Sequence, residues 1–185
     1  MVQPGEKFVP LNVGDKLLFP LREQLQPISW FPTFASAGWS HLIDGHPKYG
    51  TNSAAFGQRL GAAAIRDLSM RTFSDGLLPA LLHEDPRYFR MGSGSIPRRG
   101  WYAASCVFIG RRDSGATGFN SSVLIGHGMA SALTMAYYPD ESAKTHVVFQ
   151  TWGTSLAGEA GGNLWDEFWP DVRNKLFRRH RDPQP

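Results

Sequence analysis

The placement of prolines constrains this chain more than any other feature, because a proline excludes the interior of a helix at its own position. The first fifty residues are interrupted by Pro4, Pro10, Pro20, Pro27, Pro32 and Pro47. Only short helical pieces fit there. The long stretches that follow predict helices over Ser53–Leu78, Asn120–Tyr138 and Lys144–Trp169. The last two are expected to end at Pro139 and Pro170.

The length and the helical periodicity together predict one domain with an all-α fold. A chain of 185 residues is long enough to bury a core and too short for two ordinary domains. We expect a bundle of about four to six helices, rich in small residues. Residues 1–50 would form a proline-rich segment packed on the bundle, 51–179 the helical domain and 180–185 a flexible tail.

Small residues recur four positions apart in each long predicted helix, so they share one helical face. The rows are Ser53, Gly57 and Gly61; Ser122, Gly126 and Ala130; and Gly153, Ala157 and Gly161. Glycine inside a helix costs about 1 kcal/mol relative to alanine, and close packing is the expected compensation. The three helices are therefore expected to pack through these rows. Such rows occur in soluble bundles and in membranes alike.

Two segments favour a membrane setting. Phe119–Tyr138 has no charge unless His127 is protonated, and Val147–Trp165 carries only Glu159. Each is long enough for a hydrocarbon core of about 30 Å, and aromatic residues lie near their ends. Both also hold many polar residues, which disfavour ordinary lipid-facing spans. We therefore expect a helical pair that lies on or partly in a membrane.

Basic residues are distributed unevenly along the chain, although its net charge is only +3. Six arginines and no acidic residue lie between Pro86 and Arg112, and the end of the chain is also basic. If the two uncharged segments form an antiparallel hairpin, one basic surface would contain Arg111, Arg112, Arg178 and Arg179. The partners expected from this pattern are an anionic membrane surface and a second copy of the chain. Nucleic acid is disfavoured, because no recognition motif accompanies the arginines.

His83, Glu84 and Asp85 form the strongest candidate for chemistry, because a histidine and carboxylates together can bind a metal or move a proton. Adjacent residues on a helix point about 100° apart, so these three are not expected to converge on one ion. We expect them to close a helix end and pair with Arg87 or Arg90. No metal site and no cofactor are predicted.

Two other reactive side chains are expected to be structural. His127 lies on the glycine face of its helix, where a hydrogen-bonded interhelical histidine is favoured over a ligand or a proton relay. Cys106 lies in an apolar run and is the only cysteine, so a small buried hydrophobic residue is favoured over a catalytic thiol.

The chain resembles a family of uncharacterised bacterial envelope proteins over about Leu11 to Arg179. The resemblance rests on the sequences His83-Glu84-Asp85-Pro86-Arg87-Tyr88-Phe89, Asp113-Ser114-Gly115 with Phe119-Asn120, Ala136-Tyr137-Tyr138-Pro139, and Glu167-Phe168-Trp169-Pro170-Asp171. Tyr49-Gly50 and Gly57-Gln58-Arg59-Leu60-Gly61 add to it. The family usually carries an export signal, which is not expected within Met1–Phe19 because charged residues interrupt it. The resemblance implies an envelope location and adds no mechanism.

These observations favour a non-enzymatic, membrane- or envelope-associated helical protein that acts through packing or assembly. One alternative is a hydrolase using His83, Glu84 and Asp85, with His127 as a further candidate. The other is a soluble helical module that binds nucleic acid.

Overall fold

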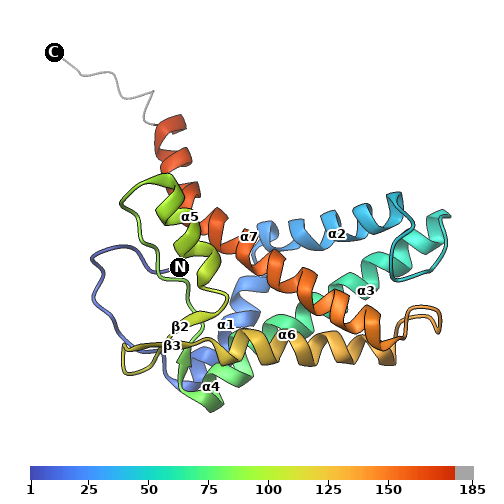
Figure 1. Cartoon of the computed structure of the whole chain (residues 1–185), viewed down its shortest axis with the longest axis horizontal. Helices are drawn as coiled ribbons and strands as arrows, with labels where there is room; N and C mark the ends of the chain where they lie inside the picture. Colours follow the sequence, from blue (N-terminus) through green and yellow to red (C-terminus); the bar gives the residue numbers. More distant parts are fainter. Residues whose placement is uncertain (178–185) are drawn as a thin grey trace.

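A computed structural model of the chain describes residues 1–177 and confirms that the protein is mostly helical (Figure 1). The helices are α1 (Val13–Gln24), α2 (Phe31–Leu42), α3 (Ser53–Arg71), α4 (Leu78–Leu82), α5 (Ile96–Ser105), α6 (Ser121–Leu133) and α7 (Thr145–Phe177). Three shorter turns join them: η1 (Pro27–Trp30) and η3 (Thr134–Ala136) are 3-10 turns, and η2 (Thr72–Leu77) is a π-helical turn. The predicted helix over 53–78 is thus α3 continued by η2.

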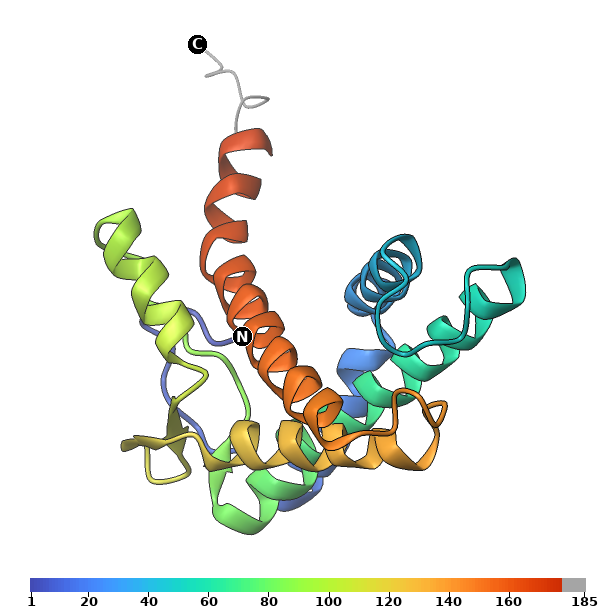
Figure 2. The same ribbon diagram turned by 45° about the vertical axis from the view of Figure 1, so that its right-hand side comes forward.

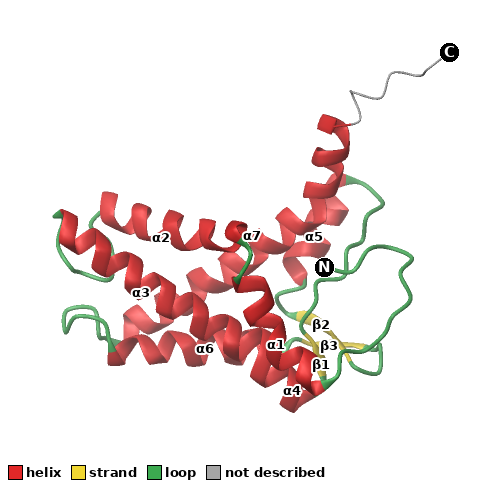
Figure 3. Cartoon of the chain, turned by 180° about the vertical axis from the view of Figure 1, so that it is seen from behind, coloured by secondary structure: helices red, strands yellow, loops and turns green. Residues whose placement is uncertain are grey.

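A small sheet makes the expectation of an all-α fold wrong in this detail. The strands β1 (Glu84–Asp85), β2 (Ile109–Arg112) and β3 (Thr117–Phe119) pair antiparallel in the order β1-β2-β3 (Figure 3). Glu84 lies opposite Arg112, and Ile109 lies opposite Phe119. Strands this short carry too few residues to show an alternating pattern in sequence. Gly115, with a φ of +83°, closes the turn between β2 and β3.

Helix α7 continues through Pro170, although the sequence predicted that it would end there. A proline removes one backbone donor, here the N–H that would reach the carbonyl of Asp166. At the next carbonyl, that of Glu167, Arg90 Nε donates at 2.9 Å and Arg99 Nη2 at 2.8 Å. These side chains supply local hydrogen bonds that compensate the disturbed helix, so tertiary contacts override the proline signal.

The helices cross one another and do not run as parallel rods. Helix α2 packs on α3, α1 packs on η2, and α6 packs on η2 and α3. Helix α7 contacts α6 near its own start and then rises away from it along α5, as the two views in Figures 1 and 2 agree. The first part of α7 packs antiparallel on α6, where Ser155 lies beside His127 and Trp152 Nε1 donates to the carbonyl of Leu124 at 3.0 Å. Beyond this contact the two helices diverge (Figures 1 and 2).

The N-terminal segment is joined to the rest of the fold by a buried ion pair. Lys16 on α1 is 1% exposed, and its ammonium donates to both carboxylate oxygens of Asp113, at 2.6 and 2.7 Å. It also donates to the carbonyl of Pro79 at 3.2 Å. Three parts of the chain meet at this ammonium: α1, α4 and the turn that follows β2.

The buried apolar side chains in residues 1–177 are mainly small. They are Ala37, Ala55, Ala62, Ala63, Met70, Ala103, Val107, Val123, Ala130, Tyr138 and Val147. Most large apolar side chains lie outside this core, at the surface. Across residues 1–177, no helix combines the length and the apolar character that crossing a membrane requires.

Candidate functional site

The three residues His83, Glu84 and Asp85 point to different partners. His83 caps α4 in the left-handed conformation, with a φ of +55°, and its side chain is 80% exposed. Its Nδ1 lies 3.7 Å from Oδ2 of Asp113. Within the described residues, no group of histidines, cysteines and carboxylates is placed to hold a metal ion.

Glu84 closes the start of helix α6. Its carboxylate accepts hydrogen bonds from the backbone amides of Ser121, at 3.3 Å, and Ser122, at 2.9 Å. The Ser122 hydroxyl donates to it as well, at 2.7 Å. The first amides of a helix lack partners within the helix, and a negative charge there is favourable. The sequence predicted an arginine partner for this carboxylate, and the structure gives it a helix terminus.

Asp85 pairs with Arg87, one of the partners that the sequence predicted. Arg87 donates from Nε at 2.9 Å and from Nη2 at 2.6 Å, and its backbone amide donates at 3.0 Å. The buried Asp85 carboxylate thus accepts these hydrogen bonds from a residue only two positions further along the chain. The hydrogen bonds of Glu84 and Asp85 are all made to other parts of the fold.

Glu167 on α7 holds the loop that follows β1. It is fully buried and accepts from Tyr88 Oη, the amide of Met91, the amide of Gly92 and Arg99 Nε, at 2.7 to 2.9 Å. Burial alone would raise the pKa of Glu167, but Arg99 and these hydrogen bonds outweigh it and lower the pKa. Two of the motifs behind the family resemblance, the one around His83 and the one around Glu167, therefore meet at this carboxylate.

Arg59 has a similar structural task at the other end of the molecule. Its buried guanidinium donates to the carbonyls of Gly45, Pro47 and Gly50, at 2.6 to 2.9 Å, and pairs with Asp44 at 2.8 Å. The Tyr49-Gly50 and Gly57-x-Arg59-x-Gly61 motifs thus fix the turn between α2 and α3.

His127 is an interhelical side chain. It is 5% exposed, and its Nδ1 lies 2.9 Å from the Ser155 hydroxyl on α7. Burial lowers the pKa of His127 to about 4, so the neutral ring is the form present at neutral pH. A neutral, hydrogen-bonded histidine matches the structural role favoured from the sequence.

The three small-residue rows have different environments. Gly126 and Ala130 are buried where α6 meets η2 and α3, and a Cβ on Gly126 would lie 2.7 Å from the backbone nitrogen of Ser74. In the other two rows, Gly57, Gly61, Gly153, Ala157 and Gly161 are exposed. A Cβ on any of these four glycines would meet nothing within 4 Å. The expected packing of the first and third rows is therefore wrong, because α3 and α7 turn these faces outward.

Of the four arginines of the expected basic surface, Arg111 and Arg112 lie in the described part of the chain. Arg111 stacks on the Phe89 ring, with its guanidinium carbon 4.4 Å from the ring centre. Arg112 is exposed on β2, and the end of α7 lies away from that strand beside α5 (Figures 1 and 3). Arg178 and Arg179 lie outside the described residues.

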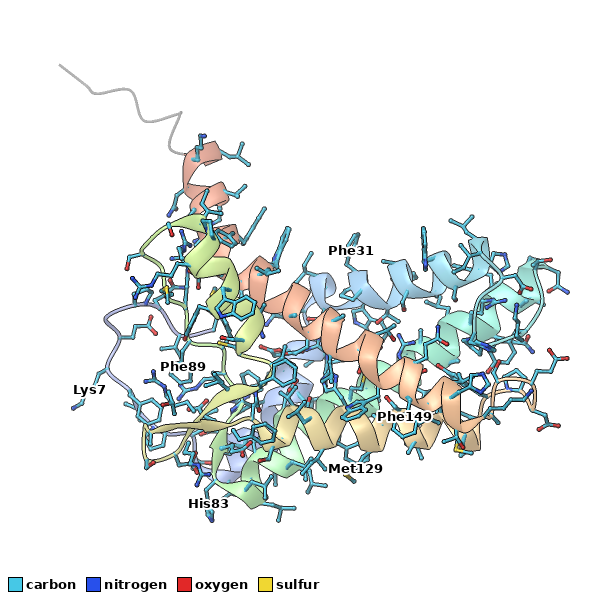
Figure 4. The ribbon with its side chains drawn as sticks, in the orientation of Figure 1. Lys7, Phe31, His83, Phe89, Met129 and Phe149 are labelled. Carbon is cyan, nitrogen blue, oxygen red and sulfur yellow. The ribbon has the colours of Figure 1, made fainter. Side chains whose placement is uncertain are left out.

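Large exposed apolar side chains are concentrated on α1, η1 and α2, and we name this surface the α1–α2 apolar face. It consists of Val13, Leu17, Leu18, Leu21, Leu25, Ile28, Trp30, Phe31, Phe34, Trp39, Leu42 and Ile43. Leu42 is 80% exposed and Phe31 69%, which is unusual for such residues in a protein surrounded only by water. Figure 4 shows Phe31 pointing outward from the molecule.

A cleft of about 910 Å³ opens beside this face, between α7 and the α1–η1–η2 side of the molecule. Aromatic side chains line it, including Phe19, Phe31 and Trp165. Nine charged residues line it as well: Glu23, Arg71, Asp75, Glu84, Asp85, Arg87, Arg111, Glu159 and Asp166. The sequence analysis did not identify this cleft, because most of its residues are far apart in the chain. Glu84 to Phe89, which belong to the motif around His83, also contribute to it.

The carboxyl groups of the cleft have perturbed acidities. Burial, and then the negative charge of Glu159, raise the pKa of Asp75 to about 8. Burial also raises the pKa of Glu159 and of Asp166, and the charge of Glu23 acts in the same direction on both. Glu23 itself pairs with Arg71 at 3.2 Å. Asp85, also in the lining, pairs with Arg87 at 2.6 Å. The six acidic side chains of the cleft outnumber its three arginines.

Comparison of the chain with family models, curated proteins and solved structures finds no match.

Proposed function

We propose that this chain is a non-enzymatic helical protein of the cell envelope that attaches to a membrane surface through the α1–α2 apolar face. The observation that carries the proposal is the exposure of leucine, phenylalanine and tryptophan side chains over Val13–Ile43. From Gln24 to Ile43 the chain has no aspartate, glutamate, lysine or arginine. A concentration of exposed apolar side chains in one segment is typical of a lipid or protein partner, whereas singly scattered apolar residues are not.

The local structure supports attachment in the plane of the interface. Helices that bind a membrane surface bury an apolar face into the boundary between head groups and acyl chains. Tryptophan is favoured at that depth, and Trp30 and Trp39 lie within the segment. Exposed basic residues, among them Arg112, Arg173 and Lys175, would add attraction to anionic lipids.

A hydrolase is not the function that the geometry supports. Glu84 and Asp85 are occupied by a helix terminus and by Arg87, and His83 projects from the surface. General acid or base chemistry requires its groups within hydrogen-bond reach of one substrate, and these three do not share such a position.

The test is flotation with vesicles that contain or lack an anionic lipid. The triple variant Phe31→Ser, Phe34→Ser, Trp39→Ser removes exposed side chains, so it is expected to keep the fold and lose vesicle binding. The matched control is Ile125→Ser, Met129→Ser, Leu133→Ser, which removes exposed apolar residues from α6 and is expected to bind like the unmodified chain. Met129 and Phe31 point in opposite directions in Figure 4.

The arginine contribution is tested by changing Arg111, Arg112, Arg178 and Arg179 together to glutamine. This variant is expected to bind anionic vesicles less tightly and zwitterionic vesicles unchanged. Negligible binding of the unmodified chain to both kinds of vesicle would overturn the proposal. Equal losses in the two serine variants would also do so, because binding would then not depend on the α1–α2 apolar face.

A further inference from the structure

The cleft beside α7 has the size and composition of a site for a small organic molecule. Its volume of about 910 Å³ falls within the range of about 300–1,000 Å³ that is usual for ligand pockets. Phe19 on α1, Phe31 on α2 and Trp165 on α7 place aromatic surface on opposite sides of it. An apolar ligand body would contact these rings.

The cleft has an excess of negative charge. Glu23 and Arg71 form an ion pair with each other. Asp75, Glu159 and Asp166 take part in no ion pair among residues 1–177, and the one hydrogen bond that Asp75 accepts from a side chain comes from Ser74 at 2.7 Å. The raised pKa values of these three carboxyl groups have the same origin, since burial is the largest cause for each. A cation inside the cleft would relieve this imbalance.

Asn163 supplies independent evidence for a ligand. It lies on α7 four residues after Glu159, so both side chains share the helical face that lines the cleft. Asn163 is 7% exposed, and within residues 1–177 its amide makes no side-chain hydrogen bond. Its amide atoms are not fully enclosed by protein and face the open cleft, where they are free to bind a polar group.

Three glycines keep the cleft open. Gly158, Gly161 and Gly162 line it, and a Cβ built on any of them meets nothing within 4 Å. Glycine lowers helix stability, so three in the middle of α7 need a compensating reason. An open space for a ligand beside the helix is such a reason. Close packing is not, because no other described helix lies against these glycines.

We propose that this cleft binds an amphiphilic primary amine. The ammonium group donates hydrogen bonds to the carboxylates of Asp75 and Glu159 and to the amide oxygen of Asn163. An ammonium has three donors and no acceptor, which matches these three acceptors. The apolar body lies against Phe19, Phe31 and Trp165. A neutral ligand gains only the apolar contacts, and an anion is repelled.

The experiment compares three probes with one body and different head groups: 4-phenylbutylamine, 4-phenyl-1-butanol and 4-phenylbutyrate. Binding to the full chain is measured by isothermal titration calorimetry without lipid. We expect the amine to bind at least about tenfold more tightly than the alcohol, because hydrogen bonds to charged groups are the strong ones, and the carboxylate not to bind.

Two pairs of variants locate the site. Asp75→Asn with Glu159→Gln removes two carboxyl groups of the cleft and keeps the side-chain shapes, so it is expected to fold and to bind the amine about tenfold more weakly. Its control is Glu141→Gln, an exposed acid outside the cleft. Gly158→Leu fills the cleft and is expected to abolish amine binding. Gly153→Leu adds the same side chain to an exposed position of α7 outside the cleft and leaves binding unchanged.

Equal affinity for the three probes, or binding of none, overturns the proposal. Unchanged amine binding by Gly158→Leu overturns it as well, because the site would then lie elsewhere. These outcomes are independent of the proposed membrane attachment, since vesicle flotation involves no amine probe and calorimetry involves no lipid.

Discussion

At the scale of single residues, the buried polar groups account for most of the motifs in the sequence. Asp85 and its partner Arg87 are two positions apart, so their pairing was predictable from local geometry. The partners of Glu167 lie 68 to 79 residues away along the chain, and only the folded structure brings them together. His127 was predictable in kind, as a hydrogen-bonded interhelical histidine, but its partner Ser155 was not.

His127 is expected to make the stability of the protein depend on pH. The folded ring has a pKa of about 4, below its ordinary value of 6.5, so between these values the unfolded chain binds the extra proton. Stability therefore falls as the pH falls from 6.5 toward 4, by up to about 3 kcal/mol, and changes little further below that window. His127→Asn is expected to lose this dependence.

Urea unfolding of the unmodified chain and the variant between about pH 4.5 and about pH 7.5 measures the difference. His146→Asn, at an exposed histidine, is the control and is expected to retain the pH dependence of the unmodified chain. If the His127 variant loses stability with falling pH as steeply as the unmodified chain, the attribution to this ring is wrong.

At the scale of elements, the sequence predicted where long helices form better than where they end. The stretches over α3 with η2, α6 and α7 are proline-free or nearly so and have helical periodicity, which is local information. The continuation of α7 past Pro170 depends on Arg90 and Arg99, which come from another part of the chain. The strands β1 to β3 are too short to have a sequence pattern.

The α1–α2 apolar face was missed for a related reason. The prolines of the first fifty residues predicted only short helical pieces, and Pro27 and Pro32 do lie in the first turn of η1 and of α2. A proline there removes only an amide that has no partner within the helix. Pro20, expected to interrupt a helix, lies inside α1. The signal that would have found the face is the absence of charged residues from Gln24 to Ile43. The cleft gives no comparable signal, because elements from most of the described chain contribute to it.

The contact between α6 and η2 is expected to tolerate no side chain at Gly126. A Cβ there would lie 2.7 Å from the nitrogen and 2.8 Å from the Cα of Ser74, and these backbone atoms cannot rotate away. Gly126→Ala is therefore expected to destabilise the protein by about 1–3 kcal/mol through overpacking, although alanine favours helices. The larger Gly126→Leu change is expected to destabilise it further.

Gly57→Ala is the matched control, since this glycine is also inside a helix but has open space around it. It is expected to stabilise the protein by about 0.5–1 kcal/mol, so the two alanine variants should differ in sign in thermal or urea unfolding. If Gly126→Ala stabilised the protein as Gly57→Ala does, α6 and η2 would have to move apart without loss of stability, and the prediction would be wrong.

At the scale of the whole molecule, the N-terminal segment is part of one structure with the helices that follow it. The buried Lys16 ammonium donates to Asp113, 97 positions away in the chain, and to the carbonyl of Pro79, 63 positions away. The expectation that residues 1–50 pack on the rest of the protein agrees with the placement of α1 against η2 and of α2 against α3.

Asp113→Asn is expected to destabilise the protein by about 3 kcal/mol, because it leaves the Lys16 ammonium buried without its counter-charge. Adding Lys16→Met to this variant is expected to restore most of the loss, since the uncompensated charge is then gone. Arg22→Met, which breaks an exposed ion pair with Asp15, serves as the control and should change stability by less than about 1 kcal/mol. Urea unfolding of the unmodified chain, the single variants Asp113→Asn and Lys16→Met, and the double variant gives the coupling free energy, and additive effects of the two changes would contradict the prediction.

The Lys16 ion pair also constrains the order in which the chain assembles. A lysine that is desolvated before its carboxylate is in place carries an uncompensated charge, which is unfavourable by several kcal/mol. The carboxylate is in place only after β2 and β3 have paired and formed the turn that holds Asp113. Docking of α1 is therefore expected late in folding, even though α1 precedes the other described helices in the sequence.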